Sequence, residues 1–586
     1  MMNTLPSTRL TSFPAMAADS PLPPQAASHA LDNMSASTLL SLLESATTYQ
    51  RDFVERSVLF WDVLRRRANN MIEHENAGLP PLLNFKYELL LDGRQFERPA
   101  NYALLRITQA GDVCWDDCVD PEKPPVIVLD PRAGHGPGLG GFKRDSEVGV
   151  ALHTGHPVYF VVFFPEPCPH QKIADVLDVL KVFVARVAEL HGGRKPILYG
   201  NCQAGWAVTL LSAASPGLPG PVVLNGSPLS YWSGEPGINP MRIMAGFGGG
   251  VWLAHFLSDL NRGRFDGAWL VQNFEMLKPG NAIWDKYAKL FGEIDTEQER
   301  FLDFERWWNG FYRLSTEEIV AISEDLFIGN RLEQGNFRLD SESTVDLKRI
   351  TNPLVVFASY GDNITPPHQA LGWIPAVYGN TDALKSAGQR IVYLTNPHVG
   401  HLGIFVSASV ARLEHRAILE HLDRIQALPP GLYEMKIENP THDPDCRKDQ
   451  YTVHFEPRSV EQVRFEYPEQ AFARVQEISE HFEGIYRAVF SPWVKALATP
   501  WLSSWLHWMH PMRVKTYMWS EAFLPWMHVI SAWADAIRCN RTAAPPELPF
   551  KDAERSVAAD VSAFWETARK VRDAAQERAF KELYVN

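Results

Sequence analysis

The segment 196–206 constrains the fold more than any other part of the chain. An apolar run ends at Gly200, Cys202 follows two residues later, and an apolar-rich segment begins soon afterwards. This order is typical of a nucleophile elbow, in which a buried strand turns sharply into a helix with the nucleophile at the corner. The crowded turn requires small neighbours, and Gly200, Ala204 and Gly205 meet that requirement. The segment therefore predicts Cys202 as a nucleophile; the alternative is an inert buried thiol.

Two later segments supply an acid and a base for this elbow. Residues 357–367 place Asp362 just past an apolar strand, and residues 399–405 place His401 in a loop of small residues. The order Cys202, Asp362, His401 is the nucleophile–acid–base order of α/β-hydrolases. A histidine can take the thiol proton, and a carboxylate can orient the imidazole and stabilise its cation. We therefore expect these three side chains to form a catalytic triad.

Each of the two later residues has a competing interpretation. Asp362 could serve only to cap the turn before the prolines that follow it, which is a common role of aspartate. His398 lies three residues before His401 and could be the base instead. We prefer His401 because Gly400 and Gly403 give it the close approach that such a loop needs.

Backbone N–H groups must stabilise the oxyanion of an acyl-transfer reaction. One donor should be the amide of Gln203, the residue after the nucleophile. The other should come from the loop that follows the apolar strand 125–130, at Arg132 or Ala133. We therefore predict an oxyanion hole between these two segments.

The same loop carries a motif with another meaning. Gly136, Gly138 and Gly141 match the G-x-G-x-x-G pattern of dinucleotide-binding proteins, and Glu166 follows where a ribose ligand would be expected. Pro137 lies inside the motif, and the motif is several residues away from the strand. We therefore interpret the loop as part of a wide oxyanion hole and keep a nucleotide site as the alternative.

Strands and helices alternate along much of the chain, which predicts a parallel sheet flanked by helices, the α/β-hydrolase fold. The expected strands are 85–91, 103–107, 125–130, 157–164, 197–199, 221–224, 353–358 and 390–394, and the expected helices include 142–153 and 172–191. The alternation stops between about 232 and 346, where a helical insertion should cover the active site as a lid.

These observations divide the chain into segments. We expect a disordered leader at 1–36, a helical extension at 37–80, the α/β core in two parts at 81–231 and 347–428, the helical lid insertion at 232–346, and a Trp-rich, mainly helical region at 429–586. Aromatic residues at helical spacing usually lie in a core or a subunit interface. If exposed, they would bind a membrane face or a polymer granule.

Composition excludes several classes of function. The net charge of −13 argues against a nucleic-acid partner, because phosphate binding needs a basic face. The six cysteines are few and irregularly spaced, which fits a reducing cytosol. Cys114 and Cys118 have no second ligand pair nearby, so we expect no metal and no bound cofactor. We find no apolar run long enough to span a membrane and expect a cytoplasmic protein.

The chain resembles the polyhydroxyalkanoate synthases, especially the shorter class that works with a partner subunit. The matching stretches are Gly-Asn-Cys-Gln-Ala-Gly at 200–205, Gly-Asp-Asn-Ile-Thr-Pro-Pro at 361–367, Gly-His-Leu-Gly-Ile-Phe-Val at 400–406, and the region 326–348. The chain, including its Trp-rich tail, is still more similar to an uncharacterised group of long bacterial proteins often labelled 3-hydroxyalkanoate synthetase-like. Asn363 stands where the synthases usually have histidine, and the tail beyond about 430 has no counterpart in them.

The resemblance implies a cysteine acyltransferase without a separate cofactor, in which coenzyme A enters as part of the substrate. Cys202 would carry a 3-hydroxyacyl chain as a thioester, His401 would deprotonate it, and Asp362 would help to activate the incoming hydroxyl group. We also expect a homodimer or a partner subunit, and a polymer granule or membrane surface to which the Trp-rich tail attaches. Two alternatives remain, a thioesterase or esterase on the same triad and a non-catalytic scaffold that binds a synthase complex or a granule.

Overall fold

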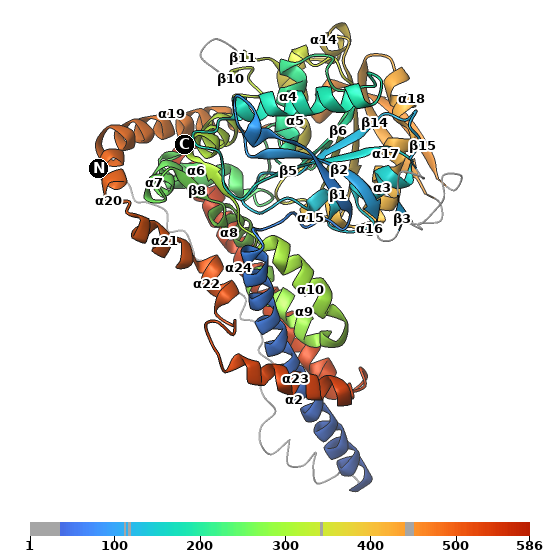
Figure 1. Ribbon diagram of the computed structural model, residues 1–586, viewed down its shortest axis with the longest axis vertical. Coiled ribbons are helices and arrows are strands. Elements are labelled where there is room, and N and C mark those ends of the chain that lie inside the picture. The colour runs from blue at the N-terminus through green and yellow to red at the C-terminus, as the bar shows by residue number, and fades with distance from the viewer. Residues whose placement is uncertain (1–35, 111–112, 115–118, 340–343, 440–450) are drawn as a thin grey trace, which may run out of the picture.

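A mixed β-sheet forms the centre of the computed structural model, which describes residues 36–110, 113–114, 119–339, 344–439 and 451–586 (Figure 1). The predicted leader lies almost wholly outside the described residues, as does Cys118. The sheet has 11 strands in the order β1-β2-β5-β4-β6-β7-β12-β13-β14-β15, with β3 paired to β2. The strands are β1 (Lys86–Asp92), β2 (Tyr102–Ala110), β3 (Val113–Cys114), β4 (Val126–Leu129), β5 (Val158–Phe163), β6 (Ile197–Asn201), β7 (Val222–Asn225), β12 (Leu354–Ser359), β13 (Arg390–Asn396), β14 (Gly431–Glu438) and β15 (Thr452–Arg458).

The central strands, from β5 to β14 in the sheet order, are parallel, and both faces of the sheet are covered. Side chains alternate between the faces, as they must in a pleated strand. Along β4, Ile127 and Leu129 pack in the core beside α4 (Ile173–Leu190) and α5 (Ala204–Ala214). Val126 and Val128 pack in the opposite core, beside α3 (Glu147–His153). The strand order and the helices on both faces confirm the predicted α/β-hydrolase fold.

Shorter elements complete this core. They are η1 (Gly93–Gln95), η3 (Leu139–Gly141), β10 (Phe337–Arg338), β11 (Thr344–Val345), η7 (Leu347–Arg349), α12 (Pro367–Leu371), α13 (Trp373–Tyr378), α14 (Thr381–Ser386), α15 (His401–Val406), α16 (Ala408–Val410), η8 (Ala411–His415), α17 (Arg416–Glu420), α18 (Leu422–Ala427) and η9 (Val460–Val463).

Two boundaries from the sequence analysis are wrong. The sheet does not end at residue 428, because β14 pairs in parallel with β13 and β15 pairs with β14. The core therefore includes the first part of the region assigned to the tail. The helix expected at 142–153 begins only at Glu147, where the side chain of Ser146 caps it by accepting from Gly149 N–H.

The insertion between β7 and β12 is mainly helical, as predicted. Its elements are η4 (Pro240–Ile243), α6 (Met244–Gly248), α7 (Trp252–Leu260), β8 (Arg264–Asp266), α8 (Ala268–Leu277), η5 (Asn281–Asp285), α9 (Lys286–Gly292), α10 (Ile294–Trp308), β9 (Arg313–Ser315), α11 (Thr316–Ala321) and η6 (Ile322–Ile328). β8 and β9 pair as a short antiparallel ribbon apart from the main sheet.

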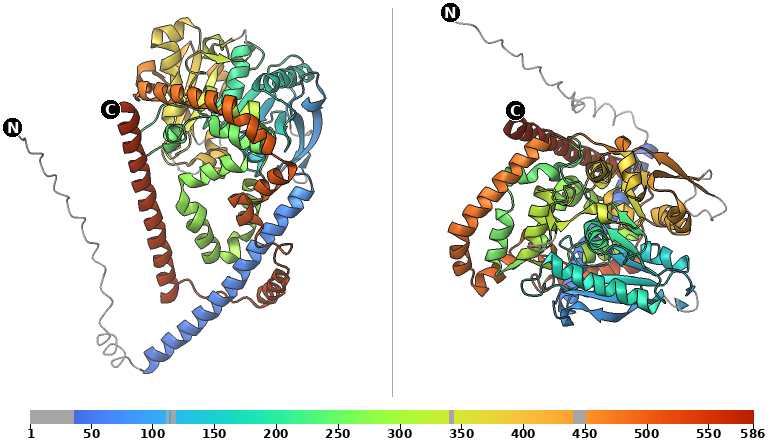
Figure 2. Two further views of the ribbon diagram at one scale, coloured as in Figure 1. Left: turned by 90° about the vertical axis from the view of Figure 1, so that its left-hand side faces the viewer. Right: turned by 90° about the horizontal axis from the view of Figure 1, so that it is seen from above.

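The two ends of the chain contribute long helices. The N-terminal extension is a single helix, α2 (Ala36–Asn76). The tail comprises α19 (Glu469–Ile485), η10 (Tyr486–Phe490), α20 (Ser491–Leu497), α21 (Pro500–Trp508), α22 (Pro511–Tyr517), α23 (Met527–Asn540), α24 (Pro549–Phe580) and η11 (Lys581–Val585). Together with α9 and α10, helices α2, α23 and α24 form a projection beside the sheet domain (Figures 1 and 2). No helix in the described ranges is both long and apolar enough to cross a membrane.

Candidate active site

Cys202 lies at the turn between β6 and α5 in a strained backbone conformation. Its φ angle is +49°, in the left-handed region that a residue with a side chain seldom adopts. A Cβ atom on Gly205 would lie 2.0 Å from Oγ of Ser227, and one on Gly200 would lie 2.8 Å from Cα of Gly205. The turn therefore has no room for side chains at these positions, which is the steric demand inferred from the sequence.

Asp362 follows β12 and uses both carboxylate oxygens. Oδ1 accepts hydrogen bonds from the N–H groups of Ile364 and Thr365, each 2.8 Å long. Oδ2 lies 2.6 Å from Nδ1 of His401. Asp362 thus caps its turn and also contacts the imidazole, so the two interpretations of this residue hold together.

His401 is the first residue of α15 and is buried with Asp362. Burial alone would lower the pKa of His401, but the charge of Asp362 and the nearby Cys202 outweigh it and raise this pKa to about 10. The imidazole is therefore held as a cation between an acid and a thiol. His398 is exposed and does not line the pocket that contains Cys202.

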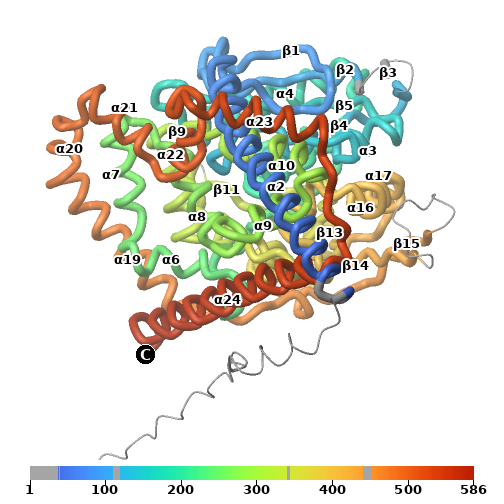
Figure 3. The backbone as a smooth tube through the Cα atoms, turned by 90° about the horizontal axis from the view of Figure 1, so that it is seen from below, coloured from blue at the N-terminus to red at the C-terminus, as the bar shows by residue number. Residues whose placement is uncertain are grey.

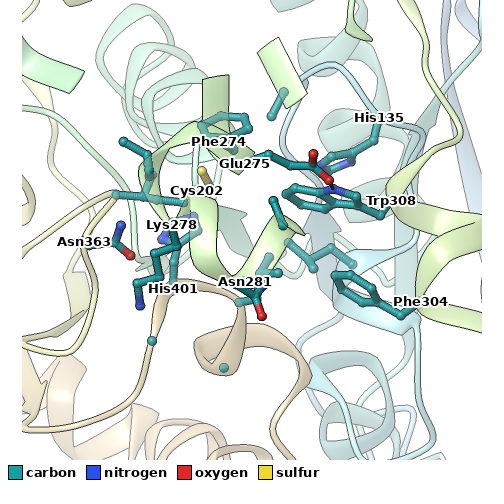
Figure 4. Close-up of a pocket in the computed structure, with 18 of the residues that line it drawn as sticks. His135, Cys202, Phe274, Glu275, Lys278, Asn281, Phe304, Trp308, Asn363 and His401 are labelled. Atoms are coloured by element: carbon teal, nitrogen blue, oxygen red, sulfur yellow. Dashed lines mark hydrogen bonds between the residues drawn. The ribbon is translucent and has the colours of Figure 1, made fainter. Parts of the chain in front are cut away.

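Cys202 and His401 open on a pocket of about 280 Å³. One wall comes from the core loops that carry Asn363 and Gly400, and the facing wall comes from the insertion. Phe274 of α8 and Trp308 of α10 line the pocket, and Trp308 lies on the side away from Cys202 and His401 (Figure 4). The insertion thus covers the site, as expected of a lid.

The predicted oxyanion donors lie in different environments. Ala133 lines the pocket, whereas Arg132 and Gln203 do not. The side chain of Arg132 is buried in an ion pair with Glu318, with Nε 3.1 Å from the carboxylate. In the part of the chain that the structure describes, the backbone N–H groups of Arg132, Ala133 and Gln203 have no backbone acceptor. Of the two candidates in the loop after β4, Ala133 is therefore the better placed donor, because it shares the pocket with Cys202.

The glycine-rich loop folds around a buried carboxylate and donates hydrogen bonds to it. Asp130, at the end of β4, accepts hydrogen bonds from the N–H groups of Gly138, Leu139 and Gly140. Glu166, the candidate ribose ligand, forms ion pairs with Arg264 and Arg313. Three N–H groups that could bind a pyrophosphate are thus occupied by Asp130, which argues against the nucleotide alternative.

A second buried acid lies behind the elbow. Glu147 accepts hydrogen bonds from Nδ2 of Asn201, at 2.5 Å, and from Nδ2 of Asn225, at 2.8 Å. Burial and the nearby charge of Asp130 raise the pKa of Glu147 well above its usual range. Glu147 therefore fixes the side chain of Asn201, the residue that immediately precedes Cys202.

Two residues that the sequence analysis did not select lie at the site. His135 lines the pocket, packs on Trp307 with ring centroids 4.1 Å apart, and has a pKa lowered to about 4 by burial. Burial and the neighbouring Cys202 raise the pKa of Tyr231 well above 10, and its buried hydroxyl has no hydrogen-bond partner in the described structure. No sequence pattern singles out either residue, because both reach the site through tertiary packing.

The described residues contain no cluster of three or more His, Cys, Asp or Glu side chains that could hold a metal ion. Cys114 lies in β3, whereas its proposed companion Cys118 lies outside the described residues. Within the described ranges, Cys168, Cys202 and Cys539 are free thiols.

Comparison with known proteins identifies similar sequences and structures. The family described as "Protein of unknown function (DUF3141)" matches residues 52–586. An "Uncharacterized protein in ackA 5'region" of Rhizobium meliloti is 42% identical over 557 residues, which cover 92% of this chain and 75% of that protein. The monoacylglycerol lipase of Paleococcus ferrophilus has a TM-score of 0.32 and 17% identity, covering 52% of this chain and 96% of that chain. A putative lipase from Acinetobacter baumannii AYE has a TM-score of 0.33 and 12% identity, covering 63% and 97%.

Proposed function

The chain belongs to the DUF3141 family of proteins of unknown function, and we propose that it is an acyltransferase of the polyhydroxyalkanoate synthase type that acts on 3-hydroxyacyl-coenzyme A thioesters. The observation that carries this proposal is the buried contact between His401 and Asp362, beside a cysteine in a strained elbow. A raised pKa of an imidazole next to a thiol supports an ion pair of thiolate and imidazolium. Such a thiolate is ready to attack a carbonyl carbon.

In the first step His401 holds the proton released by the Cys202 thiol. The thiolate attacks the thioester carbonyl, and a new carbon–sulfur bond forms at Cys202. The tetrahedral oxyanion would be bound by the free N–H groups of Ala133 and Gln203. When the intermediate collapses, the bond to coenzyme A breaks, and His401 gives its proton to the departing thiolate.

In the second step a hydroxyl group of another 3-hydroxyacyl chain attacks the acyl-enzyme. His401 takes the hydroxyl proton, an ester bond forms, and the Cys202 thiolate is released. The resemblance suggested Asp362 as the group that activates this hydroxyl. Both oxygens of Asp362 are already engaged, which favours His401 as the base and Asp362 as the group that orients it.

The pocket favours a hydroxyl group over water as the acceptor of the acyl group. Phe274, Phe304 and Trp308 give it an aromatic wall, and Cys202 is only 5% exposed. A covered apolar site disfavours water and suits the alkyl part of an acyl chain.

The test is to trap the acyl-enzyme. The protein is incubated with radiolabelled 3-hydroxybutyryl-coenzyme A and quenched, and the label is mapped by peptide analysis. Cys202→Ala is compared with Cys168→Ala and Cys539→Ala, which remove two other free thiols. We expect coenzyme A release and label on Cys202 in all proteins except Cys202→Ala, followed by growth of ester-linked chains.

The other outcomes each contradict part of the proposal. Release of coenzyme A with free 3-hydroxybutyrate and no chain growth would identify a thioesterase on the same triad. Equal behaviour of the wild type and Cys202→Ala would exclude the cysteine mechanism for this substrate. The scaffold alternative would then be favoured.

A further inference from the structure

The tail presents a continuous stripe of exposed apolar side chains, here called the apolar stripe. Its members recur at intervals of three or four residues and are between 40% and 73% exposed. They are Phe482, Ile485, Val489, Trp493, Leu497, Trp501, Trp505 and Trp508. The stripe therefore follows one face of the helical run formed by α19, η10 and α20, and it continues on α21 after a break in the helix at Ala498 and Thr499.

The opposite face of these helices is hydrogen-bonded to the insertion, so the apolar stripe points outward. The hydroxyls of Tyr486 and Ser491 donate to the buried carboxylate of Asp259, at 2.9 and 2.6 Å. Ser503 donates to Asn261 on the same insertion. α20 and α21 lie at the margin of the molecule, away from the sheet, and α19 connects them to the rest of the fold (Figures 1 and 3). Because these polar side chains bind the inner face of the helices to the insertion, the aromatic side chains on the outer face remain exposed in the folded protein.

The charge of this segment differs from that of the chain as a whole. The protein carries a net charge of −13, yet no acidic residue occurs between Glu483 and Glu521. Arg487 and Lys495 lie in the same helical run, and their side chains are 67% and 64% exposed. Each has one carboxylate partner at the inner edge, Glu483 and Asp259 respectively, and the rest of each side chain is open to solvent.

We propose that the apolar stripe binds the surface of an anionic lipid bilayer, with the helices lying in the plane of the interface. Tryptophan is the residue that prefers the boundary between headgroups and acyl chains, and amphipathic helices with apolar and basic faces bind anionic lipids. Exposed apolar surfaces of this extent mark interaction sites in soluble proteins. This inference is independent of the chemistry at Cys202.

The test is vesicle flotation of the full-length protein. Vesicles of phosphatidylcholine alone are compared with vesicles containing phosphatidylglycerol at about three lipids in ten, a composition that supplies a negative surface. The variant Trp493→Ser/Trp501→Ser/Trp505→Ser removes three members of the stripe. Phe564→Ser/Val571→Ser is the matched control, because these α24 side chains are each 65% exposed but lie outside the stripe.

We expect the wild type and the control to float with the anionic vesicles, and the triple variant to lose on the order of 100-fold in partitioning, since binding scales with the apolar area buried. Arg487→Gln/Lys495→Gln should reduce binding to the anionic vesicles more than to the neutral ones. A wild type that stays with the soluble fraction, or a triple variant that floats equally well, overturns the proposal. Dimerisation of the wild type in sedimentation velocity, lost in the triple variant without any lipid binding, would identify the stripe as a self-interface instead.

Discussion

Nδ1 of His401 lies 2.6 Å from Oδ2 of Asp362, and the other oxygen of the same carboxylate accepts two backbone N–H groups. The acid is thus fixed by its own turn before it meets the imidazole. The same turn and the start of α15 bring together residues that are separated by 38 others in the chain. This arrangement makes the charge of Asp362 the principal reason why His401 stays protonated.

Asp362→Asn should strongly reduce the reactivity of the Cys202 thiol, which is measured here as its rate of alkylation. The amide keeps the size of the side chain but lacks the charge that raises the pKa of His401, so the imidazole loses its proton at lower pH. In serine proteases the same change lowers the rate by about 10⁴-fold. We expect the rate of alkylation of Cys202 by iodoacetamide at pH 6.5 to fall at least about tenfold, which corresponds to a shift of one unit in the pKa that controls formation of the thiolate. The measurement is the alkylation rate between pH 5 and 9, read by mass spectrometry of the Cys202 peptide.

His398→Gln is the control for this experiment, because it removes the other imidazole of the same loop. His398 is exposed, so its loss should leave the alkylation profile unchanged. A profile that shifts in His398→Gln but not in Asp362→Asn would reverse the assignment of the base.

Gly205→Ala should destabilise the elbow. Its Cβ atom would lie 2.0 Å from Oγ and 2.2 Å from Cβ of Ser227, a distance that requires the backbone to move. Overpacking of this kind typically costs about 1–3 kcal/mol. Gly248→Ala, in α6 with no atom within 4 Å of the added Cβ, should be neutral or slightly stabilising. Urea denaturation of both variants checks the difference, and Ser227→Gly in the Gly205→Ala background should recover part of the loss.

The elbow was predictable because its constraints are local. Small residues at Gly200 and Gly205 and the apolar strand before them are visible in the sequence, and each has a steric cause in the structure. The chain order of Cys202, Asp362 and His401 was equally visible. Their contacts follow from the parallel sheet, which brings the carboxyl ends of β6, β12 and β13 to one edge.

Features that depend on packing between distant segments were not predictable. The pattern of apolar and polar residues in β14 does not show which strand it pairs with. Only its pairing with β13 shows that it extends the sheet beyond residue 428. His135 occupies the pocket because Trp307, far along the chain, packs against its ring. The role of the glycine loop depended on Asp130, whose carboxylate takes the N–H groups that a ligand would need. None of these partners leaves a local signal in the sequence.

The pocket wall is tied to both ends of the chain through Glu305. This buried carboxylate lies 2.8 Å from Nζ of Lys286, a pocket residue, and 3.3 Å from Nη1 of Arg67 in α2. Arg67 also donates to the carbonyl of Lys515 in α22. Burial alone would raise the pKa of Glu305, but the charges of Lys286, Arg67 and Lys515 outweigh it and lower this pKa to about 2.

Glu305→Gln should therefore reduce stability at neutral pH and flatten its acid dependence. A carboxyl with a lowered pKa stabilises the folded state fully above its ordinary pKa of 4.5, and this contribution is lost as the pH falls toward 2. We expect a loss on the order of 3 kcal/mol at pH 7, from the pKa difference and the buried cations left without a counter-charge. The free energy of unfolding in urea, measured from pH 7 to 3, should fall less steeply in the variant than in the wild type.

Glu299→Gln is the matched control for Glu305→Gln. Glu299 lies on the same helix and pairs with Arg66, but its side chain is 74% exposed. A surface pair of this kind contributes at most about 1 kcal/mol. An equal loss of stability in the two variants would contradict the importance of the buried network.

For the proposed acyltransferase function, we expect Phe274→Ala to broaden the range of acyl chains that are accepted. The Phe274 ring lines the pocket of about 280 Å³ that also contains Cys202, so its removal enlarges the space for an alkyl chain (Figure 4). Each methylene accommodated in an apolar pocket changes kcat/KM by about 10-fold or more. We expect the ratio of kcat/KM for eight-carbon over four-carbon 3-hydroxyacyl-coenzyme A to rise by on the order of 10–100-fold. Met276→Ala, on the same helix but 51% exposed, should leave the ratio unchanged. A ratio that changes equally in both variants would show that α8 acts through its fold and not through contact of Phe274 with the substrate.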